Sequence, residues 1–266
     1  AGLLSFMPTQ AATWADFNND GWLDLFIGNE ADPENIYESE LYINNGDGTF
    51  TNQAKTAGLT VTSASNPHFV KGAAAIDFNN DGWVDLYVST LLPGSKNLLF
   101  LNKGMDESGN LSFEEIGESI GLGDIVSTFP TWAFDYNNDG WMDIFVAGYR
   151  PLSNAPIAGE IVREFLGERF GAETIHLYRN NKGVFEDVSK EVGLHKIGYA
   201  MGSNYGDLDN DGYLDIFLNT GEPNFQSIIP SRVFRNNIGE TFQDVTTAGG
   251  FGNIQKGHGV SFSDID

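Results

Sequence analysis

The sequence predicts an all-β protein in which one four-stranded antiparallel repeat recurs along the chain. Three observations support this fold class. An acidic nine-residue loop occurs four times with almost the same residues, starting at positions 16, 77, 135 and 207. An apolar run follows every loop, and a segment similar to Leu-Tyr-Ile-Asn follows every run. The chain also contains 32 glycines, which suit tight turns between short strands. Short strands repeated with one period are typical of a β-propeller.

Each repeat is expected to form four strands. The first strands lead into the acidic loops and cover residues 11–17, 72–78, 131–136 and 202–208. The second strands are the apolar runs Leu23–Ile27, Val84–Val88, Met142–Val146 and Leu214–Leu218. The third strand is the Leu-Tyr-Ile-Asn segment, and a glycine-containing turn joins it to a fourth strand, near Phe50 in the first repeat. Four antiparallel strands per repeat match one propeller blade.

We therefore expect a single β-propeller domain over residues 1–266. Its blades are expected at 11–59, 72–122, 131–194 and 202–251, with a partial blade at 257–266. The third blade contains an insertion at 149–176, in which Ile157, Ile161 and Phe165 recur every four residues. This spacing predicts a short amphipathic helix. We expect the helix to cover the surface of its blade, with a partner-binding role as the alternative.

The acidic loops have the pattern of a cation site. Positions 1, 3, 5 and 9 are Asp or Asn, and position 6 is glycine. Such a loop can turn several side-chain oxygens towards one hard cation, and the backbone carbonyl of position 7 can add another. The predicted metal ligands, including the start of a fifth loop, are Asp16, Asn18, Asp20, Trp22, Asp24, Asp77, Asn79, Asp81, Trp83, Asp85, Asp135, Asn137, Asp139, Trp141, Asp143, Asp207, Asp209, Asp211, Tyr213, Asp215, Asp264 and Asp266.

The EF-hand is the nearest alternative to this interpretation. Its loop ends in a bidentate Glu at position 12, where these loops have Ile27, Val88, Val146 and Leu218. The flanking residues are also strand-like rather than helical. Oxygen ligands without nearby His or Cys favour calcium over zinc or copper, and the tendency of magnesium to keep waters disfavours it. We predict Ca²⁺ in about four complete sites, with a plain turn that binds nothing as the alternative for any single copy.

Composition excludes several classes of function. The chain has 37 acidic and 14 basic residues, and its formal net charge of -23 disfavours nucleic acid and anionic membranes as partners. No apolar run approaches the ~20 residues of a membrane span, and no cysteine is available for disulfides or thiolate metal sites. The sequence lacks a P-loop, a nucleophile elbow and a His-Glu-x-x-His motif. We therefore predict no catalytic residues and no cofactor besides the cation.

Two other groups of residues are functional candidates. The aromatic rings at position 7 are expected to pack beside the loops rather than bind sugar. His68, His176, His195 and His258 occupy non-equivalent places in the repeats, which favours local hydrogen bonds over catalysis. Among them, His258 is the candidate with most promise, because it lies beside Lys256 in a glycine-rich segment.

The motifs resemble the FG-GAP/VCBS family of calcium-binding β-propellers, related to the integrin α-subunit propeller. The closer resemblance is to the ASPIC/UnbV-associated and cartilage acidic protein type. The acidic loops, the Leu-Tyr-x-Asn-Asn segments and Lys256-Gly-His258-Gly-Val260 carry it over essentially the whole chain. It implies calcium loops between the first two strands of each blade and about seven blades, so we expect part of a larger propeller. Asn at position 3 in three loops departs from the all-Asp form.

These observations favour a non-catalytic, calcium-stabilised, extracellular or secreted propeller that serves as an adhesion, interaction or assembly module. Its expected partners are a protein, a glycan or other copies of the chain, and a bacterial source is favoured over a eukaryotic one. Two alternatives stay open. One is a polysaccharide-acting propeller enzyme with structural calcium, and the other is a self-assembling extracellular fibre or surface-layer subunit.

Overall fold

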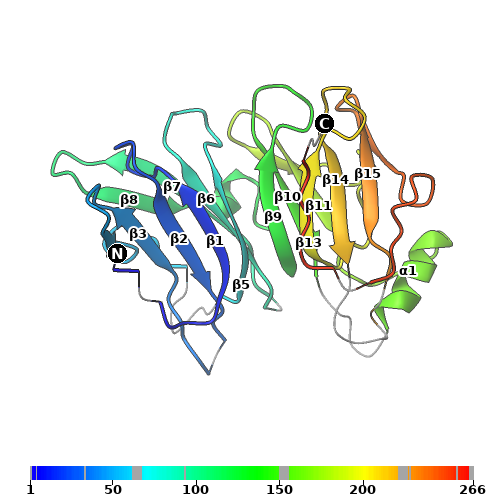
Figure 1. The fold of residues 1–266 in the computed structure, drawn as a ribbon, viewed down its shortest axis with the longest axis horizontal. Helices are drawn as coiled ribbons and strands as arrows, with labels where there is room; N and C mark the ends of the chain where they lie inside the picture. Colours follow the sequence, from blue (N-terminus) through cyan, green and yellow to red (C-terminus); the bar gives the residue numbers. More distant parts are fainter. Residues whose placement is uncertain are drawn as a thin grey trace. The chain divides into compact units, whose positions relative to one another are not determined.

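The computed structural model describes the chain except for residues 1, 4, 33, 62–67, 93, 150–155, 221–226, 228, 256 and 264–266. The described part contains sixteen β-strands, one α-helix and a short 3-10 helix, η1 (Gly117–Ile120). The strands form four antiparallel sheets of four strands, and each sheet follows the order of the chain (Figure 1). The predicted all-β fold of four-stranded propeller blades is therefore confirmed.

Each blade takes its four strands from one continuous stretch of sequence. In chain order the strands are β1 (Thr9–Ala15), β2 (Asp24–Asn29), β3 (Glu40–Asn44), β4 (Phe50–Asn52), β5 (Val70–Ile76), β6 (Asp85–Thr90), β7 (Leu98–Met105), β8 (Leu111–Glu115), β9 (Thr128–Phe134), β10 (Asp143–Gly148), β11 (Ile175–Asn180), β12 (Phe185–Asp187), β13 (Ala200–Gly206), β14 (Asp215–Thr220), β15 (Arg232–Asn237) and β16 (Thr241–Asp244).

The first strand of each blade lies slightly earlier in the sequence than predicted. In the first blade, β1 ends at Ala15, because the next residue, Asp16, folds back to accept hydrogen bonds from the loop. The second strand begins at position 9, where Asp24 pairs with Ala15. The two ends of each acidic loop are thus held next to each other by the sheet.

The chain divides into two compact units. The first contains Ala1–Ser127 and Asn180–Glu186, and the second contains Thr128–Arg179 and Asp187–Asp266. A single domain over residues 1–266 stays a prediction. None of the described helices has the length and apolar character needed to span a membrane.

The core of the first unit joins its blades through apolar side chains. Phe17, Phe26 and Phe100 are almost completely buried in one cluster. Ala57 and Leu59, from the Ala-Gly-Leu segment that ends the first repeat, belong to the same cluster. The backbone amide of Phe113 also donates to the carbonyl of Ala57 at 2.7 Å. The Ala-Gly-Leu segments therefore follow the fourth strand and help to attach one blade to the next.

The second unit has a corresponding core and carries the predicted helix. Its cluster includes Phe134, Phe145 and Phe234, and the rings of Trp132 and Phe145 stack with centroids 3.9 Å apart. Helix α1 (Ile157–Phe165) confirms the helix expected within 149–176. Residues 150–155 of that insertion lie outside the described residues.

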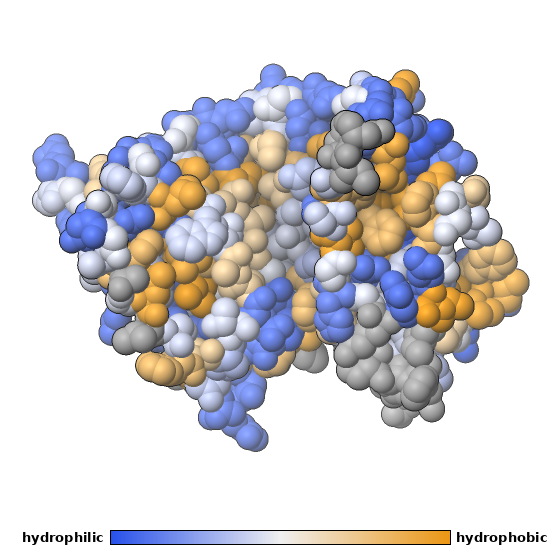
Figure 2. Space-filling view, in the orientation of Figure 1, coloured by the Kyte–Doolittle hydropathy of each residue, from blue (hydrophilic) through white to orange (hydrophobic). Residues whose placement is uncertain are grey.

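The apolar residues that predict α1 do not all face the sheet. Ile157 packs against Ile197, Tyr199 and Ile229, which precede β13 and β15 at the end of the blade opposite to the acidic loop (Figure 1). Phe165 is 87% exposed. Figure 2 shows an apolar surface in the region of α1. The place of Phe165 on the inner face is taken by Glu164, whose Oε1 lies 2.8 Å from Nη2 of Arg232. A buried ion pair therefore decides which side of the last turn faces the sheet.

Candidate metal centres in the acidic loops

The four acidic loops share one backbone conformation. Position 4 has a positive φ in each loop, between 55° and 58°, and position 6 has a φ between 87° and 89°. Left-handed residues are costly for most side chains, which explains Asn at the first place and Gly at the second. These residues are Asn19, Gly21, Asn80, Gly82, Asn138, Gly140, Asn210 and Gly212.

The carboxylates at positions 1 and 5 fold over the loop backbone. In the first loop, Oδ1 of Asp16 accepts from the amide of Asp20 at 3.1 Å, and its Oδ2 accepts from Gly21 at 2.8 Å. Oδ1 of Asp20 accepts from the amide of Trp22 at 2.8 Å, and Oδ2 accepts from the side-chain amide of Asn18. Positions 1, 3 and 5 are therefore brought together around the turn.

The same pattern recurs in the other three loops. Position 1 accepts from the amides of positions 5 and 6, and position 5 accepts from the amide of position 7, at 2.7–3.1 Å throughout. Repetition of the sequence is thus matched by repetition of the hydrogen bonds. The residues concerned are Asp77, Asp81, Gly82, Trp83, Asp135, Asp139, Gly140, Trp141, Asp207, Asp211, Gly212 and Tyr213.

The carboxylate at position 9 is the buried member of each loop. Asp24 and Asp85 are both 0% exposed. Oδ2 of Asp24 accepts from the amide of Phe17 at 3.0 Å, and Oδ1 accepts from the amide of Asn44 at 2.8 Å. Asp143 and Asp215, also fully buried, accept in the same way from the amide at position 2 of their own loops. Position 9 therefore ties the loop to the third strand of the blade.

Burial makes these carboxylates hard to ionise. It raises the pKa of Asp24 to about 6 and that of Asp85 to about 7, although the two backbone hydrogen bonds on each act in the opposite direction. Burial likewise raises the pKa of Asp215. In the described part of the chain, no basic side chain forms an ion pair with Asp24 or Asp85. A cation in the loop would compensate for the cost of these buried charges.

The fourth loop differs from the others at position 3, where it has Asp209 in place of Asn. Carboxylate oxygens of Asp207, Asp209 and Asp215 lie within 4.8 Å of one another. Nη1 of Arg235 approaches Asp209 Oδ2 to 3.7 Å, but both side chains are well exposed, so this pair contributes little. Three converging carboxylates give the fourth loop the highest density of negative charge among the described loops.

The aromatic side chains of Trp22 and Trp83, at position 7, pack over a glycine of their own blade. A Cβ atom added to Gly46 would lie 3.1 Å from Nε1 of Trp22, and one added to Gly104 would lie 2.6 Å from Cε2 of Trp83. Both glycines also have a positive φ, at 72° and 71°. The turn between the third and fourth strands therefore requires glycine, which explains why the Asn-x-Gly part of the third-strand motif accompanies the loop motif.

The asparagine of each Leu-Tyr-x-Asn segment has a role that the sequence alone does not show. The Asn of the Leu-Tyr-x-Asn segment donates its backbone amide to the position 9 carboxylate, as Asn102 does to Oδ1 of Asp85 at 2.7 Å and Asn236 to Oδ1 of Asp215 at 2.7 Å. Both asparagines are 1% exposed. These asparagines recur at a fixed place after each loop, and this repetition in the sequence is the feature that could have indicated their link to the loop.

The remaining candidates are the residues of the fifth loop, Lys256 and the histidines. The fifth-loop residues Asp264 and Asp266 are outside the described residues, as is Lys256. Nδ1 of His176 lies 2.8 Å from Asp187 Oδ2, and Nδ1 of His195 lies 3.4 Å from Thr174 Oγ1. These two histidines therefore have the local hydrogen bonds that we expected.

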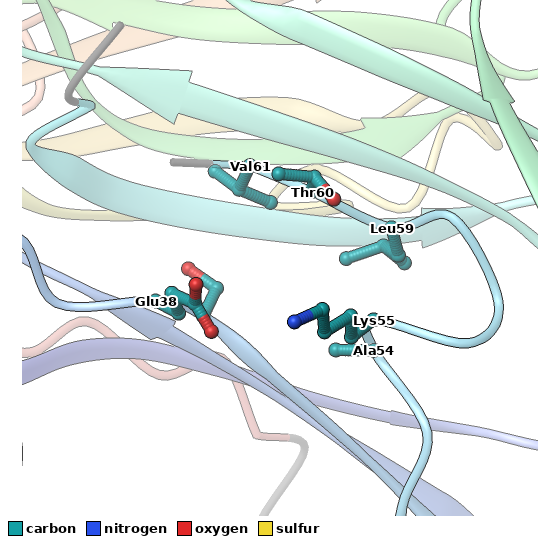
Figure 3. A pocket seen from close by; sticks show the side chains of 7 residues that line it. Glu38, Ala54, Lys55, Leu59, Thr60 and Val61 are labelled. Atoms are coloured by element: carbon teal, nitrogen blue, oxygen red, sulfur yellow. The ribbon is translucent and has the colours of Figure 1, made fainter. Parts of the chain in front are cut away.

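A small pocket in the first unit does not resemble the loops. It has a volume of about 110 Å³ and lies beyond the ends of β3 and β4, lined by Glu38, Ser39, Ala54, Lys55, Leu59, Thr60 and Val61. Figure 3 shows Glu38 and Lys55 reaching into it from opposite sides. One acidic and one basic side chain do not match the oxygen-rich chemistry of the loops.

The loops fit a hard divalent cation. They present carboxylate and amide oxygens on a tight turn, and in the first two loops the buried position 9 carboxylates, Asp24 and Asp85, have no basic partner among the described residues. Calcium accepts six to eight oxygen ligands in flexible geometry, which such a loop can supply together with water. The contribution of the position 7 carbonyls stays a prediction.

A family model described as FG-GAP-like repeat matches residues 16–88, 77–146 and 165–218. Each match ends at position 12 of an acidic loop, and together they include more than half of the chain. The chain belongs to the FG-GAP-like repeat family. The expected family is thereby confirmed, on the same loops that carried the resemblance.

Curated relatives of this FG-GAP-like repeat protein include cartilage acidic protein 1 of Homo sapiens, Mus musculus and Xenopus tropicalis. They are 30%, 29% and 27% identical over 220, 220 and 224 residues, which is 81%, 81% and 83% of this chain. The aligned parts make up 28%, 29% and 30% of those proteins, so the chain spans less than a third of their length. All three are animal proteins and give the expectation of a bacterial source no support.

Two solved structures have a weak likeness to the chain. A cryo-EM structure of RAG with one melted and one unmelted RSS covers 85% of this chain and 66% of its own, with 9% identity and a TM-score of 0.42. A GH43_1 enzyme from Xanthomonas citri with xylotriose covers 92% and 75%, with 10% identity and a TM-score of 0.42. At this level neither likeness bears on function.

Proposed function

We propose that the chain is an extracellular FG-GAP-like propeller module that calcium stabilises and that binds other molecules without catalysing a reaction. The observation that carries the proposal is the buried carboxylate at position 9 of each loop. Asp24 and Asp85 are fully buried, they accept two backbone hydrogen bonds each, and no described basic side chain pairs with them. A divalent cation supplies the missing positive charge.

The name of the relatives supports the extracellular setting, and the charge of the chain bears on its partners. Their name refers to cartilage and to acidic character, and this chain has a formal net charge of -23. Such a charge favours a basic protein partner over an anionic glycan, because opposite potentials speed association and like charges oppose it. No observation among the described residues favours the enzymatic or the fibre-forming alternative.

Calorimetry with calcium and with a chelator tests the first part of the proposal. A site held at about 100 times its dissociation constant adds about 2.7 kcal/mol, so four such sites add roughly 11 kcal/mol. We expect the melting temperature to fall by many degrees when EGTA replaces calcium. The variant Asp20→Asn, which removes one exposed loop carboxylate, should reduce this difference. An unchanged melting temperature in EGTA would exclude the proposal.

Binding assays test the second part. With calcium present, we expect the protein to bind immobilised basic proteins more strongly than anionic polysaccharides, and salt to weaken this binding. Incubation with polysaccharides should release no new reducing ends. Salt-independent binding or polysaccharide cleavage would contradict the proposed role.

A further inference from the structure

Neighbouring acidic loops of the first unit are joined through one asparagine side chain. Nδ2 of Asn102 donates to the carbonyl of Phe17 at 2.8 Å and to the carbonyl of Val84 at 2.9 Å. Phe17 is position 2 of the first loop, and Val84 is position 8 of the second. A single buried amide group therefore holds the backbone of both loops.

The connection continues to the buried carboxylates at both ends. The amide of Phe17 donates to Asp24 Oδ2 at 3.0 Å, and the amide of Asn102 donates to Asp85 Oδ1 at 2.7 Å. The position 9 carboxylates of the two loops are therefore connected by three hydrogen bonds, which are joined to one another through the residues Phe17 and Asn102. Phe17 also lies between Asp16 and Asn18, the predicted ligands at positions 1 and 3, so a cation that orders these two residues also orders Phe17.

The second unit repeats the arrangement. Nδ2 of Asn236 donates to the carbonyl of Tyr136, position 2 of the third loop, at 2.8 Å, and to the carbonyl of Leu214, position 8 of the fourth loop, at 3.3 Å. The amide of Tyr136 donates to Asp143 Oδ2, and the amide of Asn236 to Asp215 Oδ1. Because the same network occurs in both units, an accidental contact does not explain it.

A second bridge joins the exposed parts of the same loops. Nδ2 of Asn19, position 4 of the first loop, donates to the carbonyl of Gly82, position 6 of the second, at 3.0 Å. Asn138 donates to the carbonyl of Gly212 at the same distance. Each pair of loops is thus connected both in its buried part and at its tip.

We propose that the two loops of each unit bind their cations cooperatively, and that the bridging asparagines Asn19, Asn102, Asn138 and Asn236 carry this coupling. The inference rests on the proposed binding of calcium and adds its regulation. A cation that orders one loop fixes the groups that hold the next loop, so the second cation meets a loop whose ordering cost is already reduced. Coupling of this kind makes the sites of a pair fill together.

Electrostatics acts in the opposite direction and sets the condition for the test. A filled loop attracts the next cation less than an empty one does. This effect is screened over about 8 Å at physiological salt, and the tips of the loops are exposed. The hydrogen bonds do not depend on salt in this way. Cooperativity should therefore increase when salt is raised from low to physiological concentration.

The chain offers matched controls for both bridges. Asn210 has the same position and the same positive φ as Asn19, at 58° and 55°, but in the described part of the chain it makes no bond to another loop. Asn44 corresponds to Asn102, but its described bonds stay within its own blade, to Leu23, Gly46 and Asp24. Glycine is the suitable replacement at position 4, because it tolerates the positive φ.

The experiment is an isothermal titration of the calcium-free protein with CaCl₂, with the wild-type chain and its variants. We expect a Hill coefficient between about 1.5 and 2 for the wild type. The double variant Asn19→Gly/Asn138→Gly keeps the bridges of Asn102 and Asn236, so it should bind the same number of ions with a coefficient between about 1 and the wild-type value and with a weaker affinity for the later ions. Asn210→Gly should behave as the wild type. Asn102→Ala should also lower the coefficient, whereas Asn44→Ala should not.

The outcomes separate this inference from the proposed function. A protein that takes up no calcium contradicts both. Normal uptake with a coefficient of about 1 in the wild type, or an unchanged coefficient in Asn19→Gly/Asn138→Gly, overturns the coupling and leaves calcium binding intact. If Asn102→Ala does not fold, because Phe17 and Val84 lose a buried donor, the exposed position 4 variants decide the question.

Discussion

The two ends of a blade are held by different kinds of interaction. At the acidic-loop end, the carboxylates at positions 1 and 5 accept hydrogen bonds from amides five or fewer residues away, as Asp16 does from Gly21, and the pattern is the same in every described loop. At the opposite end of the second unit, Glu164 on α1 pairs with Arg232 on β15, and Arg232 also bonds to Asp244 at 2.9 Å. These partners are far apart in the sequence.

The difference shows how a repeat combines a fixed end with a variable one. The turn of each loop depends on contacts within one motif, so every copy of the motif builds the same turn. The opposite end depends on whichever side chains the fold brings together, so it can accept a helix in one blade and a small pocket in another. Three variants test whether the two ends contribute to stability in these separate ways.

The largest effect is expected at the loop end, from Asp85→Ala. This change leaves the buried amides of Phe78 and Asn102 without their acceptor. Each lost partner costs about 1–3 kcal/mol, so we expect a loss of roughly 2–6 kcal/mol in the free energy of unfolding, measured with urea in calcium. The control Asp47→Ala removes an exposed turn carboxylate and should cost less than about 1 kcal/mol. A loss in Asp85→Ala as small as that of the control would contradict the structural role of position 9.

A smaller effect is expected at the opposite end, from Arg232→Met. The side chain of Glu164 is only 6% exposed, so removal of its main partner leaves a buried charge. Breaking such a pair costs about 3–5 kcal/mol, and Lys196, at 3.8 Å, should offset part of this loss. Arg235→Met, at an exposed pair, is the matched control and should change stability little. The melting temperature of Arg232→Met should fall equally in calcium and in EGTA; a fall seen only in calcium would mean that the two ends are not separate.

The smallest effect is a dependence on pH at the same end. Burial lowers the pKa of His176, but its hydrogen bond to Asp187 and its ion pair with Glu173 outweigh burial and raise the pKa to about 9. The protonated form therefore stabilises the fold fully below about pH 6.5, the ordinary pKa of His, and this contribution is lost as the pH rises to about 9. We expect the free energy of unfolding in EGTA to fall by up to about 3 kcal/mol over this interval. His176→Gln should flatten the curve, and an equal slope in this variant would assign the dependence to other groups.

The position of the strands shows how far the sequence could be interpreted. The sequence places the start of the strand after each loop to within one residue and its end to within two, because the apolar run is clear. The sequence places the strand before each loop about two residues too late. In the first blade, Asp16 was expected to belong to the strand, whereas its carboxylate accepts hydrogen bonds from the loop. The helix at Ile157–Phe165 was found from its spacing. The face of the helix that contacts the sheet could not be predicted from the apolar residues, because the ion pair between Glu164 and Arg232 determines it.

The sequence by itself determined the repeat, the blade and the loop. Each of these depends on groups within a few residues of one another, such as the glycine at position 6 and the carboxylates at positions 1 and 5. Only the tertiary structure decided that Asn102 and Asn236 hold two loops at once and that position 9 is buried against the third strand. Such roles arise because packing brings one blade's asparagine to the carbonyl of another, across 85 residues in the case of Asn102 and Phe17.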